Sequence, residues 1–113
     1  MEITEIKPPR QFKVKTIEIK HCANITLEPD EQVTFETESG TEYDVVRKSW
    51  GYYATSSING RLKEHGLRGV LVKNSGGRIY LLLVEKGKEP DFEQYMLKDD
   101  MKVMSWLDDS SNF

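Results

Sequence analysis

The chain is 113 residues long, 37% hydrophobic and 31% charged, and carries a formal net charge of −3. This length suits one domain with one hydrophobic core, and eleven aromatic residues argue against intrinsic disorder. The sequence pI of 5.4 argues against a nucleic-acid partner. No apolar run approaches the roughly 18 residues of a membrane span, which argues against a membrane. One cysteine excludes an intrachain disulfide, and the N-terminus lacks a signal-peptide pattern, so we expect a cytoplasmic protein.

The N-terminal quarter of the chain is predicted to be extended. Residues 1–9 form an edge strand or a loose arm, because two consecutive prolines cannot continue a central strand. Residues 12–20 form a second strand, whose apolar residues change from even to odd positions halfway along. A strand can bury both sets on one side only with an extra residue, so the pattern predicts a β-bulge near residues 15–16.

The middle of the chain alternates between turns and short strands. A turn at residues 28–31 leads into a strand at 32–37, with Val33 and Phe35 facing inward. A hairpin turn at 38–41 joins it to a strand at 42–48, and residues 50–55 are also extended. For residues 56–66 two structures compete. Either Ser56 or Ser57 caps a short helix that ends at Gly66, or Asn59-Gly60 forms a hairpin turn.

The second half has clearer patterns. Residues 67–86 form a β-hairpin, and its uninterrupted apolar run at 79–84 predicts a central strand covered on both faces. Pro90 opens a helix with an apolar stripe of Phe92, Tyr95 and Met96. Residues 101–107 form the last strand, and 108–113 a frayed tail. The sequence therefore predicts one α+β domain spanning 1–113. We expect a mostly antiparallel curled sheet or partial barrel of about six to seven strands, with one short and one longer helix.

Positive charge is concentrated in one span. Residues 45–73 carry a net charge of +5 within a chain of −3, which predicts a site for an anion. Arginine forks bind carboxylate or phosphate, and aromatic planes suit a sugar or a base. The predicted ligand-binding residues are Arg47, Lys48, Trp50, Tyr52, Arg61 and Arg68, and the three arginines are expected to converge. In the alternative interpretation, Trp50 and Tyr53 are core anchors and the basic residues form a solvated rim.

Other candidate chemistry is weaker. Adjacent residues on a strand point to opposite faces, so His21 and Cys22 do not form a nucleophile pair there, and Cys22 is expected to be dispensable. His65 has no metal-ligand spacing around it, and its place at a helix C-terminus is explained by the helix dipole. The glycines form no phosphate-binding pattern. No metal, cofactor or catalytic residue is predicted.

The run VVRKSWGYYATSSINGRLKEHGLRGVLVKN, the strand YLLLVEKGK and the terminal WLDD resemble a family of short, uncharacterised bacterial proteins, a domain of unknown function. Its pattern is Arg-Lys-x-Trp-Gly-Tyr-Tyr-Ala-Thr leading into Asn-Gly-Arg-Leu, and the resemblance covers about residues 21–109. It implies a bacterial cytosolic protein and implies no activity, substrate or cofactor.

Two functions from different classes follow from these observations. The first is a non-catalytic binding or accessory module for an anionic small molecule or for the acidic surface of a protein partner. The alternative is a small lyase- or isomerase-like enzyme acting on a phosphorylated or acidic sugar, in which an arginine holds the substrate and a tyrosine or His65 moves a proton. A single-stranded nucleic-acid binder comes third, because the low pI counts against it.

Overall fold

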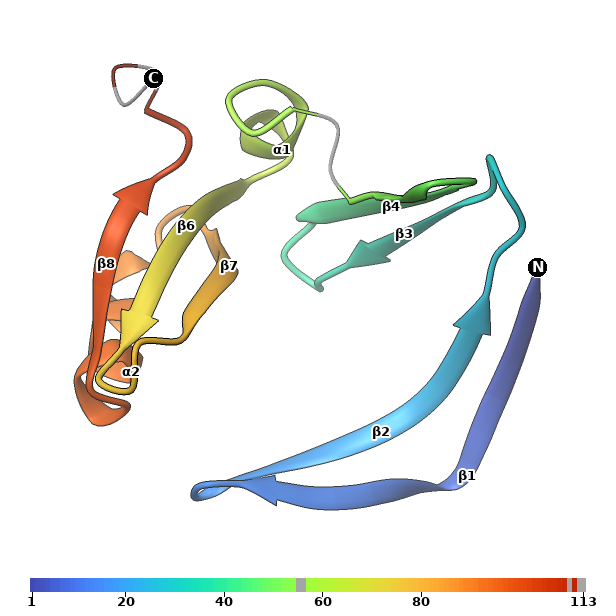
Figure 1. The fold of residues 1–113 in the computed structure, drawn as a ribbon, viewed down its shortest axis with the longest axis horizontal. Helices are drawn as coiled ribbons and strands as arrows, with labels where there is room; N and C mark the ends of the chain where they lie inside the picture. Colours follow the sequence, from blue (N-terminus) through green and yellow to red (C-terminus); the bar gives the residue numbers. More distant parts are fainter. Residues whose placement is uncertain (55–56, 110, 112–113) are drawn as a thin grey trace.

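The computed structural model describes residues 1–54, 57–109 and 111. Their elements are β1 (Glu2–Val14), β2 (Ile17–Thr26), β3 (Gln32–Glu36), β4 (Glu42–Lys48), β5 (Gly51–Tyr53), α1 (Arg61–Glu64), β6 (Leu67–Asn74), β7 (Ile79–Glu85), α2 (Glu89–Lys98) and β8 (Met101–Trp106). Every strand pair is antiparallel, which confirms the α+β class. The strands form three open sheets (Figure 1), not one curled sheet. We call them the hairpin arm (β1–β2), the middle sheet (β3-β4-β5) and the C-terminal sheet (β7-β6-β8).

The hairpin arm corrects the predicted bulge at residues 15–16. Those two residues are a hairpin turn, and Lys15 has a φ of 57°. The chain therefore turns back on itself, and Val14 pairs with Ile17. The only register shift in the arm falls between Glu5 and Arg10, where the prolines lie. The edge strand predicted for residues 1–9 is present, but it continues past the prolines to residue 14.

Antiparallel pairing explains the change of parity that the sequence displays. Directly opposed residues lie on the same face of a two-stranded sheet. Phe12 is opposite Ile19 and Val14 is opposite Ile17, so all four share one face. Ile3 and Ile25, which are also paired, continue that face toward the base of the arm. The middle of the same face is polar, because the pairs Glu5–Ala23 and Arg10–His21 also lie on it, so the arm is amphipathic mainly in its outer part, at Phe12, Val14, Ile17 and Ile19.

The middle sheet leaves its aromatic residues exposed. Phe35 was predicted to face inward, but 51% of its surface is exposed, whereas Val33 is half-buried as expected. The Phe35 ring stacks on Tyr43, its register partner, with the ring centroids 6.2 Å apart. An inward-facing pattern in the sequence therefore does not lead to burial of Phe35.

The C-terminal sheet and α2 enclose the hydrophobic core. The core consists of Val70 and Val72 from β6, Val84 from β7, and Phe92 and Met96 from α2. The central strand is β6, which corrects the prediction that residues 79–84 are central and covered on both faces. Strand β7 is an edge, and Ile79 and Leu81 on it are 55% and 57% exposed. Tyr95 of the predicted apolar stripe is 40% exposed.

The predicted short helix is present but covers only Arg61–Glu64 and follows a turn at residues 58–60; its N-cap residue is Gly60, which corrects the predicted serine cap. Helix α1 is one turn long and buries Leu62, and the chain leaves it through Gly66 with a φ of 89°. The Oγ of Ser57 accepts a hydrogen bond of 2.8 Å from the backbone N–H of Arg61. Thr55 and Ser56 lie outside the described residues. No helix of the described part is long and apolar enough to cross a membrane.

A carboxylate at the end of β7 joins the C-terminal sheet to the β3–β4 turn. One oxygen of Glu85 accepts hydrogen bonds from the hydroxyls of Thr37 (2.6 Å), Ser39 (2.8 Å) and Thr41 (3.2 Å). Hydrogen bonds from Thr37 and then Ser39 lower the pKa of Glu85 to about 2, and Lys88 contributes less. The charged carboxylate therefore favours the folded state.

This contact predicts an acid dependence of stability. Because the folded pKa is depressed, the contribution of Glu85 is fully present above the ordinary glutamate pKa of 4.5 and disappears as the pH falls toward about 2. The difference in melting temperature between wild type and Glu85→Gln should shrink over this pH range. Glu93→Gln, on the exposed face of α2, serves as the control. A difference that does not change with pH would contradict the prediction.

Candidate functional site

Four of the predicted ligand-binding residues lie together at the end of the β4–β5 hairpin. We call Arg47, Lys48, Trp50 and Tyr52 the β4–β5 tip. Trp50 occupies the turn and is 71% exposed, and Tyr52 on β5 is 60% exposed. This exposure contradicts the alternative in which Trp50 and Tyr53 are core anchors, since Tyr53 is also 44% exposed. Gly51 follows the turn with a φ of 146°, a conformation that L side chains rarely adopt.

The two cations of the tip have different surroundings. Arg47 is the register partner of Tyr52, so their side chains share a face, and its Nη1 donates a hydrogen bond to the carbonyl of Lys48. Among residues 1–54, 57–109 and 111, no carboxylate forms an ion pair with Arg47. The Nζ of Lys48 lies 2.6 Å from Oδ1 of Asp30, which is itself 74% exposed. An exposed pair of this kind contributes little to stability.

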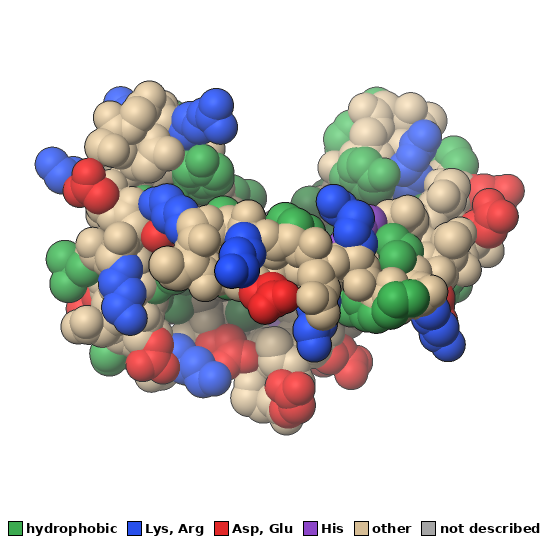
Figure 2. Space-filling view, turned by 90° about the horizontal axis from the view of Figure 1, so that it is seen from below, with side chains coloured by type: hydrophobic (Ala, Val, Ile, Leu, Met, Phe, Trp, Pro, Cys, Tyr) green, Lys and Arg blue, Asp and Glu red, His purple; other side chains and the backbone are tan. Residues whose placement is uncertain are grey.

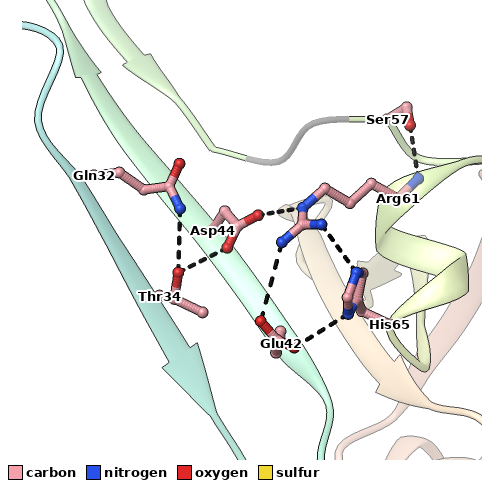
Figure 3. Close-up of polar contacts among 7 residues, drawn as sticks. All are labelled: Gln32, Thr34, Glu42, Asp44, Ser57, Arg61 and His65. Carbon is pink, nitrogen blue, oxygen red and sulfur yellow. Dashed lines mark hydrogen bonds and ion pairs between the residues drawn. The ribbon is translucent and has the colours of Figure 1, made fainter.

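Arg61 is held in a compact network with two acidic residues of β4 (Figure 3). Its Nε donates to Oδ2 of Asp44 at 2.6 Å, and its Nη2 lies 4.0 Å from Oε1 of Glu42. The other Asp44 oxygen accepts a hydrogen bond of 2.8 Å from Thr34. The Arg61 hydrogen bond, followed by that of Thr34, lowers the pKa of Asp44, and Asp44 raises the pKa of Arg61. The network fixes α1 against β4.

His65 belongs to the same network, which bears on its predicted role in proton transfer. Its Nε2 lies 2.9 Å from Nη1 of Arg61, and its Nδ1 lies 3.2 Å from Oε2 of Glu42. Since the guanidinium can only donate, Nε2 accepts and Nδ1 donates to the carboxylate. Both ring nitrogens are occupied, so this geometry does not favour His65 as the acid or base of a lyase or isomerase.

Arg68 lies in a separate network at the end of the C-terminal sheet. Its Nε and Nη2 donate to the two oxygens of Asp108 at 2.8 and 3.2 Å, and its Nη1 donates to Glu89 at 3.2 Å. The guanidinium carbon lies 4.0 Å from the centroid of the Trp106 ring. The hydrogen bond from Arg68 lowers the pKa of Asp108. Asp108, with only 6% of its side chain exposed, is therefore anchored rather than frayed. Residues 110, 112 and 113 of the predicted tail lie outside the described residues.

The three arginines expected to converge therefore differ in their surroundings. Arg61 is bound by carboxylates of β4, and Arg68 by carboxylates of the helix start and the C-terminal segment, with no partner in common. Of the cations in residues 45–73, Lys48, Arg61 and Arg68 form ion pairs with acidic residues outside that span. Of the three arginines, Arg47 alone has no carboxylate partner among the described residues.

Three cavities formed by described residues lie away from the β4–β5 tip. One cavity of about 620 Å³ lies between the β3–β4 turn and α2, and another of about 490 Å³ lies at the β6–β7 turn and β8. A third, about 280 Å³, separates the tip of the hairpin arm from α2. None of them is lined by a residue of the β4–β5 tip. Within the described part of the chain, no cluster of three or more His, Cys, Asp or Glu residues could hold a metal ion.

Comparisons with protein-family models, with curated proteins and with solved structures found no match. The predicted membership in a bacterial family of unknown function therefore stays a prediction.

Proposed function

We propose that the protein is a non-catalytic binding module that recognises an acidic protein surface through the β4–β5 tip. The observation that carries this proposal is the exposure of Trp50 and Tyr52, at 71% and 60%, next to Arg47. Trp, Tyr and Arg are the residue types that dominate binding energy at protein interfaces. An exposed aromatic cluster beside a cation is typical of such a surface.

The shape of the tip favours a protein over a small anion as the partner. Small-molecule sites are concave and bury most of their ligand, whereas the tip is the end of a hairpin and lines none of the cavities described above. A partner carboxylate can accept paired hydrogen bonds from the Arg47 fork. The rings of Trp50 and Tyr52 supply rigid apolar contact area at low entropic cost.

The test is a titration with a decaglutamate peptide, followed by tryptophan fluorescence. We expect the emission of Trp50 to shift on binding, and Trp50→Phe to abolish the shift. Arg47→Gln should weaken binding by about tenfold or more, because a charge-assisted hydrogen bond contributes about 1.5–3 kcal/mol. The control is Arg78→Gln, which removes the same charge from the exposed β6–β7 turn.

Two outcomes would contradict the proposal. If Arg78→Gln weakens binding as much as Arg47→Gln, the attraction depends on overall charge and not on the tip. If inorganic phosphate shifts the emission and the peptide does not, the partner is a small anion instead of a protein surface.

A further inference from the structure

The molecule exposes more surface than a compact chain of its size. Its accessible surface is 8277 Å², whereas a folded monomer of 13.1 kDa exposes about 6,400 Å². The radius of gyration is 15.8 Å, compared with roughly 13 Å for a compact domain of this length. About 1,900 Å² per chain is therefore exposed beyond the usual amount.

Much of this surface belongs to the hairpin arm. Each residue of β1 and β2 is exposed except Ile6, Phe12, His21 and Ala23, which are half-buried. The apolar face of the arm includes Val14, Ile17 and Ile19, at 49%, 44% and 39% exposed. An isolated two-stranded hairpin is marginally stable in water, so an arm of this length needs a surface to cover it.

Within the described residues, the outer end of the arm contacts α2 of its own chain. The Nζ of Lys15 lies 3.3 Å from Oδ1 of Asp99 at the end of α2. The cavity of about 280 Å³ between Ile17 and α2 leaves this contact loosely packed. Figure 2, seen from the side on which the arm lies, shows hydrophobic side chains exposed among charged side chains of both signs.

A second apolar face is partly uncovered on the C-terminal sheet, because Ile58 and Leu107 pack on it at Gly69 but the end near the β6–β7 turn is exposed. Helix α2 covers the face that carries Val70 and Val72. On the opposite face Leu71 pairs with Leu81, and Ile79 lies beside them. Ile79 and Leu81 are more than half exposed. One molecule thus carries two partly uncovered apolar sheet faces, each suited to sheet-on-sheet packing.

We infer that these two faces meet in a symmetric dimer, in which the arm of each copy packs on the open face of its partner's C-terminal sheet. Burying the excess surface of both copies would remove roughly 3,800 Å² in total, within the range of about 2,000–5,000 Å² for obligate dimers. Such an arrangement is isologous and closes after two subunits.

Charge favours contact between the arm and the partner's C-terminal sheet over contact between two arms. Residues 7–20, the outer half of the arm, carry a net charge of +4, and the rest of the chain carries −7. Two arms in contact would bring two positive segments together. The three strands of the C-terminal sheet carry a net charge of +2, which is less than the +4 of a second arm, so like-charge repulsion is weaker against the sheet than against another arm.

The first test is the mass of the full chain in solution, measured by sedimentation equilibrium. We expect a dimer for the wild type at micromolar concentration and a monomer for Ile19→Lys, which places a charge on the apolar face. The control, Asn24→Lys, adds the same charge to the polar face of the same strand and should remain dimeric. A monomeric wild type, or a dimeric Ile19→Lys, would overturn the inference.

The second test identifies the two surfaces and does not depend on a destabilised variant. Chains carrying Ile19→Cys and chains carrying Leu81→Cys, both with Cys22→Ser, are co-expressed with different tags and treated with a short bismaleimide. We expect the mixed heterodimer to be the main cross-linked product. If Ile19→Cys links mainly to itself, the arms pack on each other and the proposed arrangement is wrong.

Discussion

Replacement of Phe92 by alanine is expected to lower the free energy of unfolding by about 3–5 kcal/mol, the usual cost of removing a buried aromatic ring. Phe92 is 9% exposed and lies at the centre of the contact between α2 and the C-terminal sheet. Its ring meets Trp106 edge to face, with the centroids 5.7 Å apart and the planes at 72°. The described core has few buried residues, so few neighbouring side chains can move into the space that the Phe92 ring leaves.

Urea denaturation followed by circular dichroism measures this loss. The matched control is Leu97→Ala on the same helix, because Leu97 is 76% exposed. Its truncation should change the free energy of unfolding by no more than about 0.5 kcal/mol. Equal losses for the two variants would mean that α2 does not pack on the sheet through Phe92.

The fold class could be predicted from the sequence, because turn residues and alternation mark nearly all the strands. The identity of the central strand of the C-terminal sheet could not be predicted. Strand β7 has the longest apolar run, yet β6, which contains Arg68 and Gly69, lies between β7 and β8. Arg68 is tolerated there because it is paired at the end of the sheet. Ile58 and Leu107 pack at Gly69, each 3.7 Å from where a Cβ would lie, which is ordinary contact distance. Hydrophobicity alone does not give strand order when several apolar faces are uncovered.

The error in the hairpin arm has a simple physical origin. A change of parity between Val14 and Ile17 fits a bulge within one strand, and it fits a two-residue turn between two strands equally well. The sequence has no glycine or asparagine at Lys15-Thr16 to indicate the turn, and Lys15 adopts a positive φ instead. Turn chemistry could not have distinguished the two alternatives here.

The candidate site was predictable in part. A net charge counted from Val45 onward leaves out Glu42 and Asp44, which bind Arg61. The available signal for this network was the spacing of its members. The two acids are two residues apart on a strand, and Arg61 and His65 are four apart in a helical segment. The pairing of Arg68 with Asp108 joins residues 40 positions apart, and no local pattern predicts it.

Replacement of Arg68 by alanine is expected to cost about 3 kcal/mol of stability, because it leaves a nearly buried carboxylate without its partner. The change removes both hydrogen bonds to Asp108, the hydrogen bond to Glu89 and the contact with the Trp106 ring. Arg68→Lys should recover only part of the loss, since an ammonium cannot form the paired hydrogen bonds of the fork.

A double variant and the pH dependence show whether Asp108 is responsible for the loss. Adding Asp108→Asn to Arg68→Ala should restore part of the stability, because no unpaired charge is then buried. Arg68 holds the pKa of Asp108 below its usual range, so the loss caused by Arg68→Ala should be complete at neutral pH and shrink as the pH falls and Asp108 becomes protonated. An Arg68→Ala protein as stable as the wild type at neutral pH would exclude this structural role. Arg68 would then again be a candidate ligand-binding residue.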